Sequence, residues 1–272
     1  VQVILASTHG RVPASSGMLD RSYLFDVEPS AVVFAPHWEE DFRPHLVRRR
    51  IDQEVIVETK FTQALGKPPV MVAGMTPSTV NHELVAACQN AGFHAELAGG
   101  GLPRESRFRE RIQQLLDACQ PGLGVTVNML FLNHRQWGMQ YPTLLSMAEQ
   151  GCPVEGVTVA AGVPSLDKCE ELLSSFARVG VRHVSFKPGS VSSIRQVVEI
   201  ARRNPRTTVL LQWTGGRGGG HHSCEDFHEP LLETYAEIRQ VPNLVLVVGS
   251  GFGDGEGSFP YLTGQWSVEH GR

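Results

Sequence analysis

The chain has 272 residues, of which 41% are hydrophobic and 19% charged, so it is long enough and apolar enough to bury a sizeable core. Its formal net charge of -4 gives no electrostatic reason to expect nucleic acid or an acidic membrane as a partner. No apolar stretch approaches the length of a membrane span, and the start lacks a signal-peptide pattern, so we expect a cytoplasmic protein.

Residues 1–57 lack the regular strand and helix patterns found in the rest of the chain. Short apolar runs at 1–6 and 31–34 are separated by prolines and serines, and no helical period continues for long. We expect an irregular or meander-like β linker here, followed by a second domain over residues 58–272. The beginning at Val1, without an initiator Met, indicates a piece of a longer polypeptide.

From residue 58 onward, strand-like and helix-like runs alternate, and each pair takes about thirty residues. Seven apolar runs predict strands at 70–73, 94–98, 124–130, 154–160, 183–186, 209–213 and 244–248. Helices are predicted at about 79–91, 104–118, 136–150, 166–179, 190–201 and 229–239. This alternation predicts right-handed β-α-β units and a parallel sheet, whose strands are apolar throughout because both faces are covered.

Two helices carry more specific predictions. In the first, the helical period places Val80, Leu84, Val85 and Cys88 on the buried face. In the fourth, Ser165 is predicted to be the N-cap, because its side-chain oxygen can accept a hydrogen bond from the first turn.

The distribution of glycines favours a (β/α)8 TIM barrel within the α/β class. They follow the carboxyl ends of most strands, whereas an open doubly wound sheet usually carries its phosphate-binding glycines after the first strand. Only seven strands are predicted before the chain ends at Arg272. We therefore expect a barrel that is C-terminally incomplete and has two open edges, unless another segment fills the gap.

The most distinctive stretch runs from Gln212 to Ser223, where five of the six positions from Gly215 are glycine. Glycine accepts positive φ angles and lets backbone N–H groups approach a ligand, and histidine adds a titratable donor. A ligand site is favoured over a flexible linker, because a strand leads directly into the loop. The residues predicted at this site are Gly218, Gly219, Gly220, His221 and His222.

Four other strands carry candidate ligand-binding residues at or near their carboxyl ends. Gly249, Ser250 and Gly251 offer N–H groups that could hold a phosphate, with an ordinary glycine turn as the alternative. Gly74, Met75 and Thr76 could press the main chain against a flat ring. Asn128 would need hydrogen-bond partners if buried, either on a ligand or in a core network, and Lys187 could contact a cofactor or form an ion pair with Glu96.

Other chemistries are disfavoured. The histidines at 221, 222 and 228 and Cys224 are crowded on one loop without a second ligand group, so no metal site is predicted. Serine hydrolase chemistry lacks its Gly-x-Ser-x-Gly elbow. The five cysteines are scattered and form no C-x-x-C pair, which is typical of reduced thiols.

Several motifs together resemble the enoyl reductase domain of the fungal type I fatty acid synthase β subunit. They are VAGMTP at 72–77, ELAGGG at 96–101, KPGS at 187–190, the stretch 212–223, GSGFG at 249–253 and PYLTG at 260–264. The resemblance covers essentially the whole chain. It implies an FMN-containing TIM barrel that uses NADPH to reduce an enoyl chain carried on acyl carrier protein, assembled with α subunits and other β chains.

The resemblance also implies roles for individual residues. Gly74, Met75 and Thr76 would line the flavin, Asn128 and Lys187 would contact it, Gly249 to Gly251 would hold its phosphate, and His221 or His222 would donate a proton. The family continues into an eighth strand that this sequence does not reach. A flavin-dependent nitronate oxidase of the nitronate monooxygenase type and a catalytically incomplete scaffold fragment remain the alternatives.

Overall fold

The structure is a computed structural model, and it describes residues 2–3, 45–48, 55–216, 223–249, 251–252 and 254–263. The chain divides into two compact units. Unit 1 consists of residues 1–2 and 70–251, and unit 2 of residues 3–69 and 252–272.

Unit 1 contains the barrel strands. In chain order they are β4 (Val70–Val72), β5 (His94–Ala98), β6 (Val125–Leu130), β7 (Val154–Ala160), β8 (His183–Phe186), β9 (Thr208–Thr214) and β10 (Leu244–Gly249). Each pairs in parallel with the next strand along the chain. The predicted TIM-barrel-like fold of seven successive parallel strands is confirmed.

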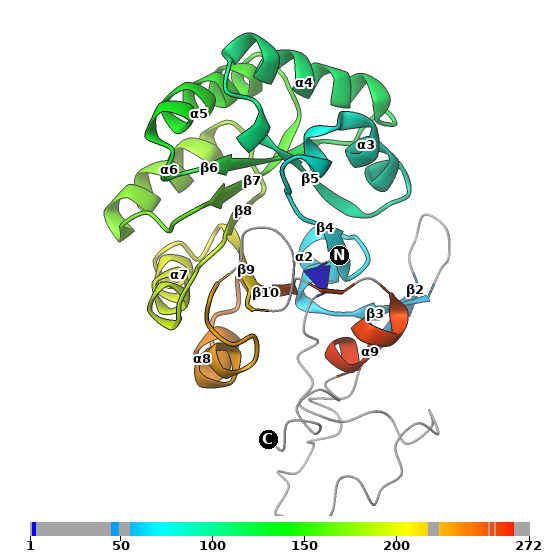
Figure 1. Cartoon of the computed structure of the whole chain (residues 1–272), viewed down its shortest axis with the longest axis vertical. Helices are drawn as coiled ribbons and strands as arrows, with labels where there is room; N and C mark the ends of the chain where they lie inside the picture. Colours follow the sequence, from blue (N-terminus) through cyan, green and yellow to red (C-terminus); the bar gives the residue numbers. More distant parts are fainter. Residues whose placement is uncertain are drawn as a thin grey trace, which may run out of the picture. The chain divides into compact units, whose positions relative to one another are not determined.

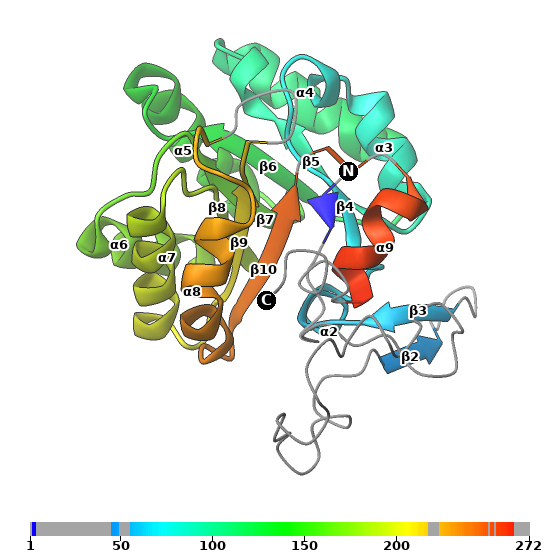
Figure 2. The same cartoon turned by 60° about the horizontal axis from the view of Figure 1, so that its bottom comes forward.

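A strand from the start of the chain lies between β10 and β4 in the sheet order. The two-residue strand β1 (Gln2–Val3) lies there in the sheet order, so the barrel closes (Figure 2). In the part of the chain that the structure describes, no strand follows β10. Within the described residues the C-terminal series thus ends at β10, as predicted, and the N-terminal strand β1 fills the gap that we expected to be open.

Six α-helices connect these strands and lie on the outside of the sheet (Figure 1). They are α3 (His82–Asn90), α4 (Glu105–Ala118), α5 (His134–Glu149), α6 (Leu166–Arg178), α7 (Val191–Arg203) and α8 (Glu229–Arg239). Two 3-10 turns, η4 (Ser78–Val80) and η5 (Gly99–Gly101), follow β4 and β5. The N-cap role predicted for Ser165 is confirmed, because its side chain accepts from the backbone N–H of Lys168 at 3.4 Å.

The predicted buried face of α3 was partly wrong. Leu84 is 43% exposed, whereas Val85, Ala86 and Gln89 are buried. The amide of Gln89 donates to the backbone carbonyl of Gly124 at 3.3 Å. This hydrogen bond satisfies a buried polar side chain, so α3 can turn Gln89 inward and leave a leucine in solvent.

The strands are buried on both faces, but they are not apolar throughout as predicted. The side chain of Glu96 on β5 is hydrogen-bonded to that of Gln212 on β9, and these strands are not neighbours, so both side chains lie inside the barrel. Successive side chains in a strand point to opposite faces. The apolar positions Leu97 and Leu211, both 0% exposed, therefore face the helices, and part of the interior is occupied by polar side chains.

Unit 2 contains a β-hairpin and two short helices. Strands β2 (His45–Arg48) and β3 (Val55–Glu58) pair antiparallel, and a capping box at Thr59 begins α2 (Lys60–Leu65). Residues 4–44 lie outside the described residues, so most of the predicted linker has no structural description. The helix α9 (Gly255–Thr263) was not predicted, because its glycines are poor helix formers; the side chain of Asp254 accepts from the N–H of Gly257 at 2.7 Å in its first turn.

Candidate functional site

Glu96 is fully buried in β5 and forms the centre of a hydrogen-bond network inside the barrel. Its Oε2 accepts from the backbone N–H of Gly74 at 2.8 Å and from Nδ2 of Asn128 at 3.0 Å. Its Oε1 accepts from Oγ1 of Thr158 at 2.7 Å and from Nε2 of Gln212. The carboxylate thus joins the end of β4 to β6, β7 and β9.

The network extends to β8 through Gln212, whose Nε2 also donates to Oγ of Ser185 at 2.7 Å. Glu96, Asn128, Thr158, Ser185 and Gln212 are at most 3% exposed. The interior of a TIM barrel is ordinarily filled by branched apolar side chains. A buried polar cluster at these positions is costly unless its hydrogen bonds are made, so this network is a candidate functional site.

Lys187 follows β8 and interacts electrostatically with this network. Burial lowers the pKa of its ammonium group, and the negative charge of Glu96 partly opposes that shift. Among the described residues no ion pair joins Lys187 to Glu96, so the predicted ion pair is not confirmed, although the charge of Glu96 acts on the pKa of Lys187. A lysine with a lowered pKa loses its proton more readily than an exposed lysine.

The loops after β4 and β5 meet at this end of the barrel without room for side chains. A Cβ atom at Gly74 would lie 2.5 Å from Cβ of Asn128, and one at Gly100 would lie 2.9 Å from Oγ1 of Thr76. Glycine is therefore required at both positions. Met75, between Gly74 and Thr76, has a side chain that is 41% exposed. The structure thus brings together three predicted site residues, Gly74, Thr76 and Asn128.

Asn128 is held in a core network. Its amide nitrogen donates to Glu96, which is the second of the two alternatives that the sequence left open. Contact between Asn128 and a ligand stays a prediction.

The predicted phosphate loop lies at the end of β10. Gly249 is buried and is the last residue of that strand, where it pairs with Thr214 of β9. Gly251 is exposed and has a φ of 82°, a conformation that favours glycine. Ser250 lies outside the described residues. In the described part of the chain, neither glycine is hydrogen-bonded to the network of Glu96.

The glycines and histidines predicted at 218–222 also lie outside the described residues, but both ends of that segment are described. The backbone N–H of Ser223 donates to the carbonyl of Thr214 at 2.7 Å, and that of Gly216 donates to the carbonyl of Glu225 at 3.1 Å. The segment therefore leaves and rejoins the scaffold at the carboxyl end of β9.

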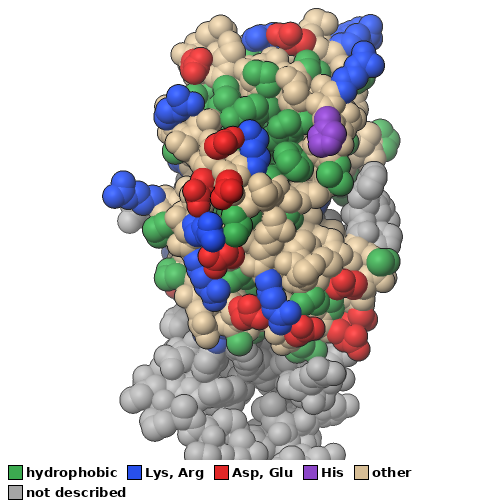
Figure 3. Space-filling model, turned by 90° about the vertical axis from the view of Figure 1, so that its left-hand side faces the viewer, with side chains coloured by type: hydrophobic (Ala, Val, Ile, Leu, Met, Phe, Trp, Pro, Cys, Tyr) green, Lys and Arg blue, Asp and Glu red, His purple; other side chains and the backbone are tan. Residues whose placement is uncertain are grey.

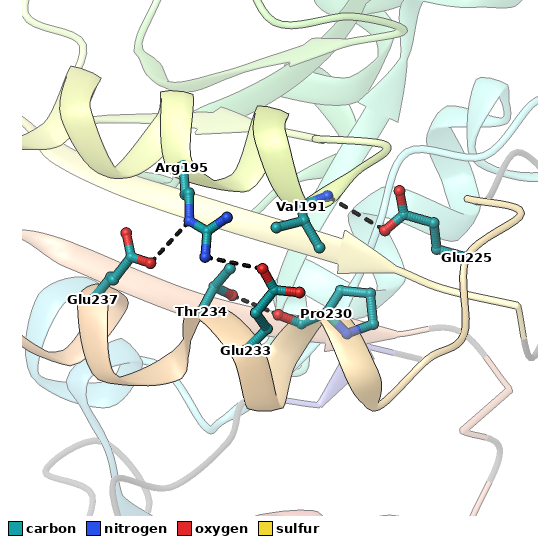
Figure 4. Close-up of polar contacts among 7 residues, drawn as sticks. All are labelled: Val191, Arg195, Glu225, Pro230, Glu233, Thr234 and Glu237. Carbon is teal, nitrogen blue, oxygen red and sulfur yellow. Dashed lines mark hydrogen bonds and ion pairs between the residues drawn. The ribbon is translucent and has the colours of Figure 1, made fainter.

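Ser223 connects this point to the loop that carries Lys187. Its Oγ donates to the carbonyl of Gly189 at 2.7 Å and accepts from the backbone N–H of Glu225 at 3.0 Å. Glu225 in turn accepts from the N–H of Val191, the first residue of α7, at 3.3 Å (Figure 4). An acidic group is favourable at a helix N-terminus, so the loops after β8 and β9 stabilise each other.

Replacing Ser223 by alanine tests this connection. We expect Ser223→Ala to lower the free energy of unfolding by about 1–2 kcal/mol, because it removes two partly buried hydrogen bonds. Urea denaturation measures the loss. Ser175→Ala is the control, because Ser175 accepts only an exposed hydrogen bond, from Arg178 on the same helix. Equal free energies of unfolding for the two variants would contradict the proposed stabilisation.

The outer surface of unit 1 carries both signs of charge, as Figure 3 shows for one face. Arg195 on α7 pairs with Glu233 at 3.0 Å and with Glu237 at 2.9 Å, both on α8 (Figure 4). All three side chains are at least 36% exposed, so these pairs contribute little to stability.

A groove on the outside of the barrel is a second possible binding place. It is lined by residues of α4 and α5 and of the loop before β7, among them Arg109, Met147 and Cys152. No residue that the sequence analysis assigned to a site lines this groove. The candidate site therefore remains at the carboxyl ends of the strands.

The sequence analysis missed most of the polar network. It named Glu96 only as a partner of Lys187 and gave no role to Thr158 or Ser185. The available signal was the alternation of polar and apolar residues in the strands, as in His-Ala-Glu-Leu-Ala at 94–98 and Val-Thr-Val-Asn-Met-Leu at 125–130.

None of the helices that the structure describes combines the length and the hydropathy that a membrane-spanning helix needs.

Comparison with known proteins identifies relatives over most of the chain. "Fatty acid synthase 2" of Mycosarcoma maydis is 51% identical over 92% of this chain. "Fatty acid synthase beta subunit aflB" of Emericella nidulans is 48% identical over 88% of it. "Fatty acid synthase subunit beta" of Schizosaccharomyces pombe is 45% identical over 90% of it. These alignments cover only 7%, 11% and 12% of the relatives' own lengths.

A family model described as "Fatty acid synthase subunit beta/Fas1-like, helical" matches residues 208–272. Among solved structures, 3-dehydroquinate dehydratase from Geobacillus kaustophilus aligns with 78% of this chain and 90% of that chain, at 14% identity and a TM-score of 0.41. That score is too low to support an argument. The sequence relatives and the family model agree with each other, and the chain belongs to the family of fungal fatty acid synthase β subunits, of which it spans one segment.

Proposed function

We propose that this chain forms most of an FMN-dependent enoyl-[acyl-carrier-protein] reductase domain of a fatty acid synthase β chain. The observation that carries the proposal is the cluster of Gly74, Asn128 and Lys187 around the buried carboxylate of Glu96. It lies at the carboxyl ends of the barrel strands, where TIM-barrel enzymes have their active sites.

The described residues fit a flat cofactor that carries negative charge. Gly74 and Gly100 leave no room for a Cβ, because their main chain packs directly against Asn128 and Thr76 respectively. Lys187 supplies a cation with a lowered pKa. The residues that would contact the ring of FMN are Gly74, Met75, Thr76, Asn128 and Lys187. The residues that would contact its phosphate, or form a loop close to it, are Gly218, Gly219, Gly220, Gly249, Ser250 and Gly251. When bound, FMN would carry hydride equivalents from NADPH to the β-carbon of an enoyl thioester.

The chain itself would supply the proton and the charge stabilisation. As the double bond is reduced, negative charge develops on the thioester oxygen and the α-carbon requires a proton. His221 or His222 is the proposed proton donor, since imidazole titrates near neutral pH. The hydrogen bond between Ser223 and Gly189 joins the end of the histidine segment to the loop of Lys187, which supports a shared site.

The partners of the whole protein are part of the same proposal. The relatives are named as fatty acid synthase subunits, which supports a hetero-oligomer. We infer that the substrate is an enoyl chain on acyl carrier protein, and that the chain assembles with α subunits and other β chains in the cytoplasm.

The test uses a longer β chain that contains this sequence together with the residues that follow Arg272. We expect a yellow protein that oxidises NADPH only when an enoyl thioester is present. His221→Ala or His222→Ala is expected to keep the flavin and to lower turnover by about 100-fold or more, because a positioned general acid contributes a factor of this size. His82→Ala, at the start of α3, is the control and should retain turnover.

Two outcomes would contradict the proposal. A colourless protein would exclude the flavin. Turnover of a nitronate without NADPH oxidation would instead favour the nitronate oxidase.

A further inference from the structure

Among the described residues, only the nitrogen of the Gln212 side-chain amide forms hydrogen bonds. Its Nε2 donates to Oε1 of Glu96 and to Oγ of Ser185 at 2.7 Å. Its Oε1 has no hydrogen-bond donor among the residues that the structure describes, although the side chain is 0% exposed. Buried polar atoms in native proteins are nearly always paired, so this oxygen requires an explanation.

The orientation of this amide is determined by its neighbour. A carboxylate has no hydrogen to donate, so the NH2 end of Gln212 must face Glu96. The reversed amide would place two acceptor oxygens against each other inside the barrel. Glu96 therefore holds Oε1 of Gln212 in the direction away from the carboxylate.

The position of Gln212 relative to Lys187 indicates what could pair with the free acceptor. Phe186, the last residue of β8, is in register with Leu211 on β9, so Lys187 directly after β8 comes beside Gln212 on β9. Lys187 is partly exposed, whereas Gln212 is fully buried. The ammonium group of Lys187 can donate a hydrogen bond, and Oε1 of Gln212 can accept one. At neighbouring positions, these two groups can pair with a ring edge that carries a carbonyl next to an N–H group.

We propose that Gln212 is a ligand-binding residue whose Oε1 accepts a hydrogen bond from the imide N–H of a planar heterocycle, and that Glu96 is the positioning residue that orients it. The inference rests on the proposed function, in which the heterocycle is the isoalloxazine ring of FMN. It adds a residue and a specific recognition contact to the site.

The experiment compares FMN with 3-methyl-FMN, in which a methyl group replaces the imide hydrogen. Dissociation constants are measured by fluorescence titration of the flavin-free longer β chain. The unaltered protein is expected to bind 3-methyl-FMN at least about tenfold more weakly than FMN, the effect of losing one buried hydrogen bond. Gln212→Met, which has no amide, is expected to bind both flavins with similar constants.

Two further variants separate orientation from contact. Glu96→Gln allows either orientation of the Gln212 amide, so it is expected to reduce the preference for FMN. Gln113→Met is the control, because Gln113 is exposed on α4 and bonded to Asp117, and it should keep the full preference. Circular dichroism establishes that each variant is folded.

The outcomes are distinct. If the unaltered protein binds both flavins equally, or if Gln212→Met retains the preference for FMN, the inference is overturned and the proposed function stands. The comparison of FMN with 3-methyl-FMN on the unaltered protein needs no variant, so the inference can be tested even if Gln212→Met does not fold. If the unaltered protein binds neither flavin, the inference and the proposed function both fail.

Discussion

Replacing Glu96 by alanine is expected to lower the free energy of unfolding by about 3–5 kcal/mol, the cost of breaking a buried charged network by removing one partner. The substitution removes the acceptor of four donors, a part-buried one on Gly74 and buried ones on Asn128, Thr158 and Gln212. It also removes the charge that opposes the lowering of the pKa of Lys187. Urea denaturation followed by tryptophan fluorescence measures the loss, with the buried Trp213 as reporter.

The control for this prediction is Glu110→Ala. Glu110 is a glutamate of α4 that pairs with Arg107 at 2.9 Å, and its side chain is 47% exposed. An exposed ion pair of this kind contributes about 0–1 kcal/mol, so the control is expected to unfold nearly as the unaltered protein does. A Glu96→Ala protein as stable as Glu110→Ala would show that the interior carboxylate does not stabilise the barrel.

Replacing Gly156 by alanine is expected to lower the free energy of unfolding by about 3 kcal/mol, because overfilling a packed core forces its neighbours to move. Gly156 lies on β7, and a Cβ atom there would overlap the imidazole ring of His183 on β8. His183 is 1% exposed and packs edge-on against His94, with 5.1 Å between the ring centroids. The ring therefore has little space to move.

A matched glycine provides the control for Gly156→Ala. Gly138 lies inside α5, and a Cβ atom there would have no neighbour within 4 Å. Gly138→Ala is expected to raise the free energy of unfolding by about 0.5–1 kcal/mol, because alanine has the higher helix propensity. The double variant Gly156→Ala with His183→Ala should lose less than the sum of its single variants, as expected for residues in contact. Additive losses would refute the overlap.

The two predictions concern side chains in the barrel interior, which the sequence analysis described least well. It predicted β7 with the residue bounds that the structure has, since a short apolar run between turn residues is a local signal. It gave no role to Gly156 or to His183, because their contact joins positions 27 residues apart, 156 and 183, on different strands. Such contacts depend on strand register, which no local pattern in one strand defines.

The candidate site was likewise predicted only in part from the sequence. Gly74, Asn128 and Lys187 were chosen because they lie within or just beyond the carboxyl ends of strands, and parallel strands bring these ends to one rim. Their common partner, Glu96, sits in the middle of β5 and has hydrogen bonds to four other segments of the chain. Its role became visible only when the barrel placed those segments around it.

By itself, the amino-acid sequence determined the order of strands and helices from β4 to β10 and their parallel arrangement in a barrel, because periodicity, caps and turn residues act within a few positions of each other. The tertiary structure alone decided that β1 stands beside β10, that Leu84 faces solvent, and that Gln212 meets Glu96 across the interior. These features depend on barrel closure and register. Barrel closure and strand register both depend on contacts between residues far apart in the chain. No single stretch of sequence contains all the strands involved, so no single stretch can define these features.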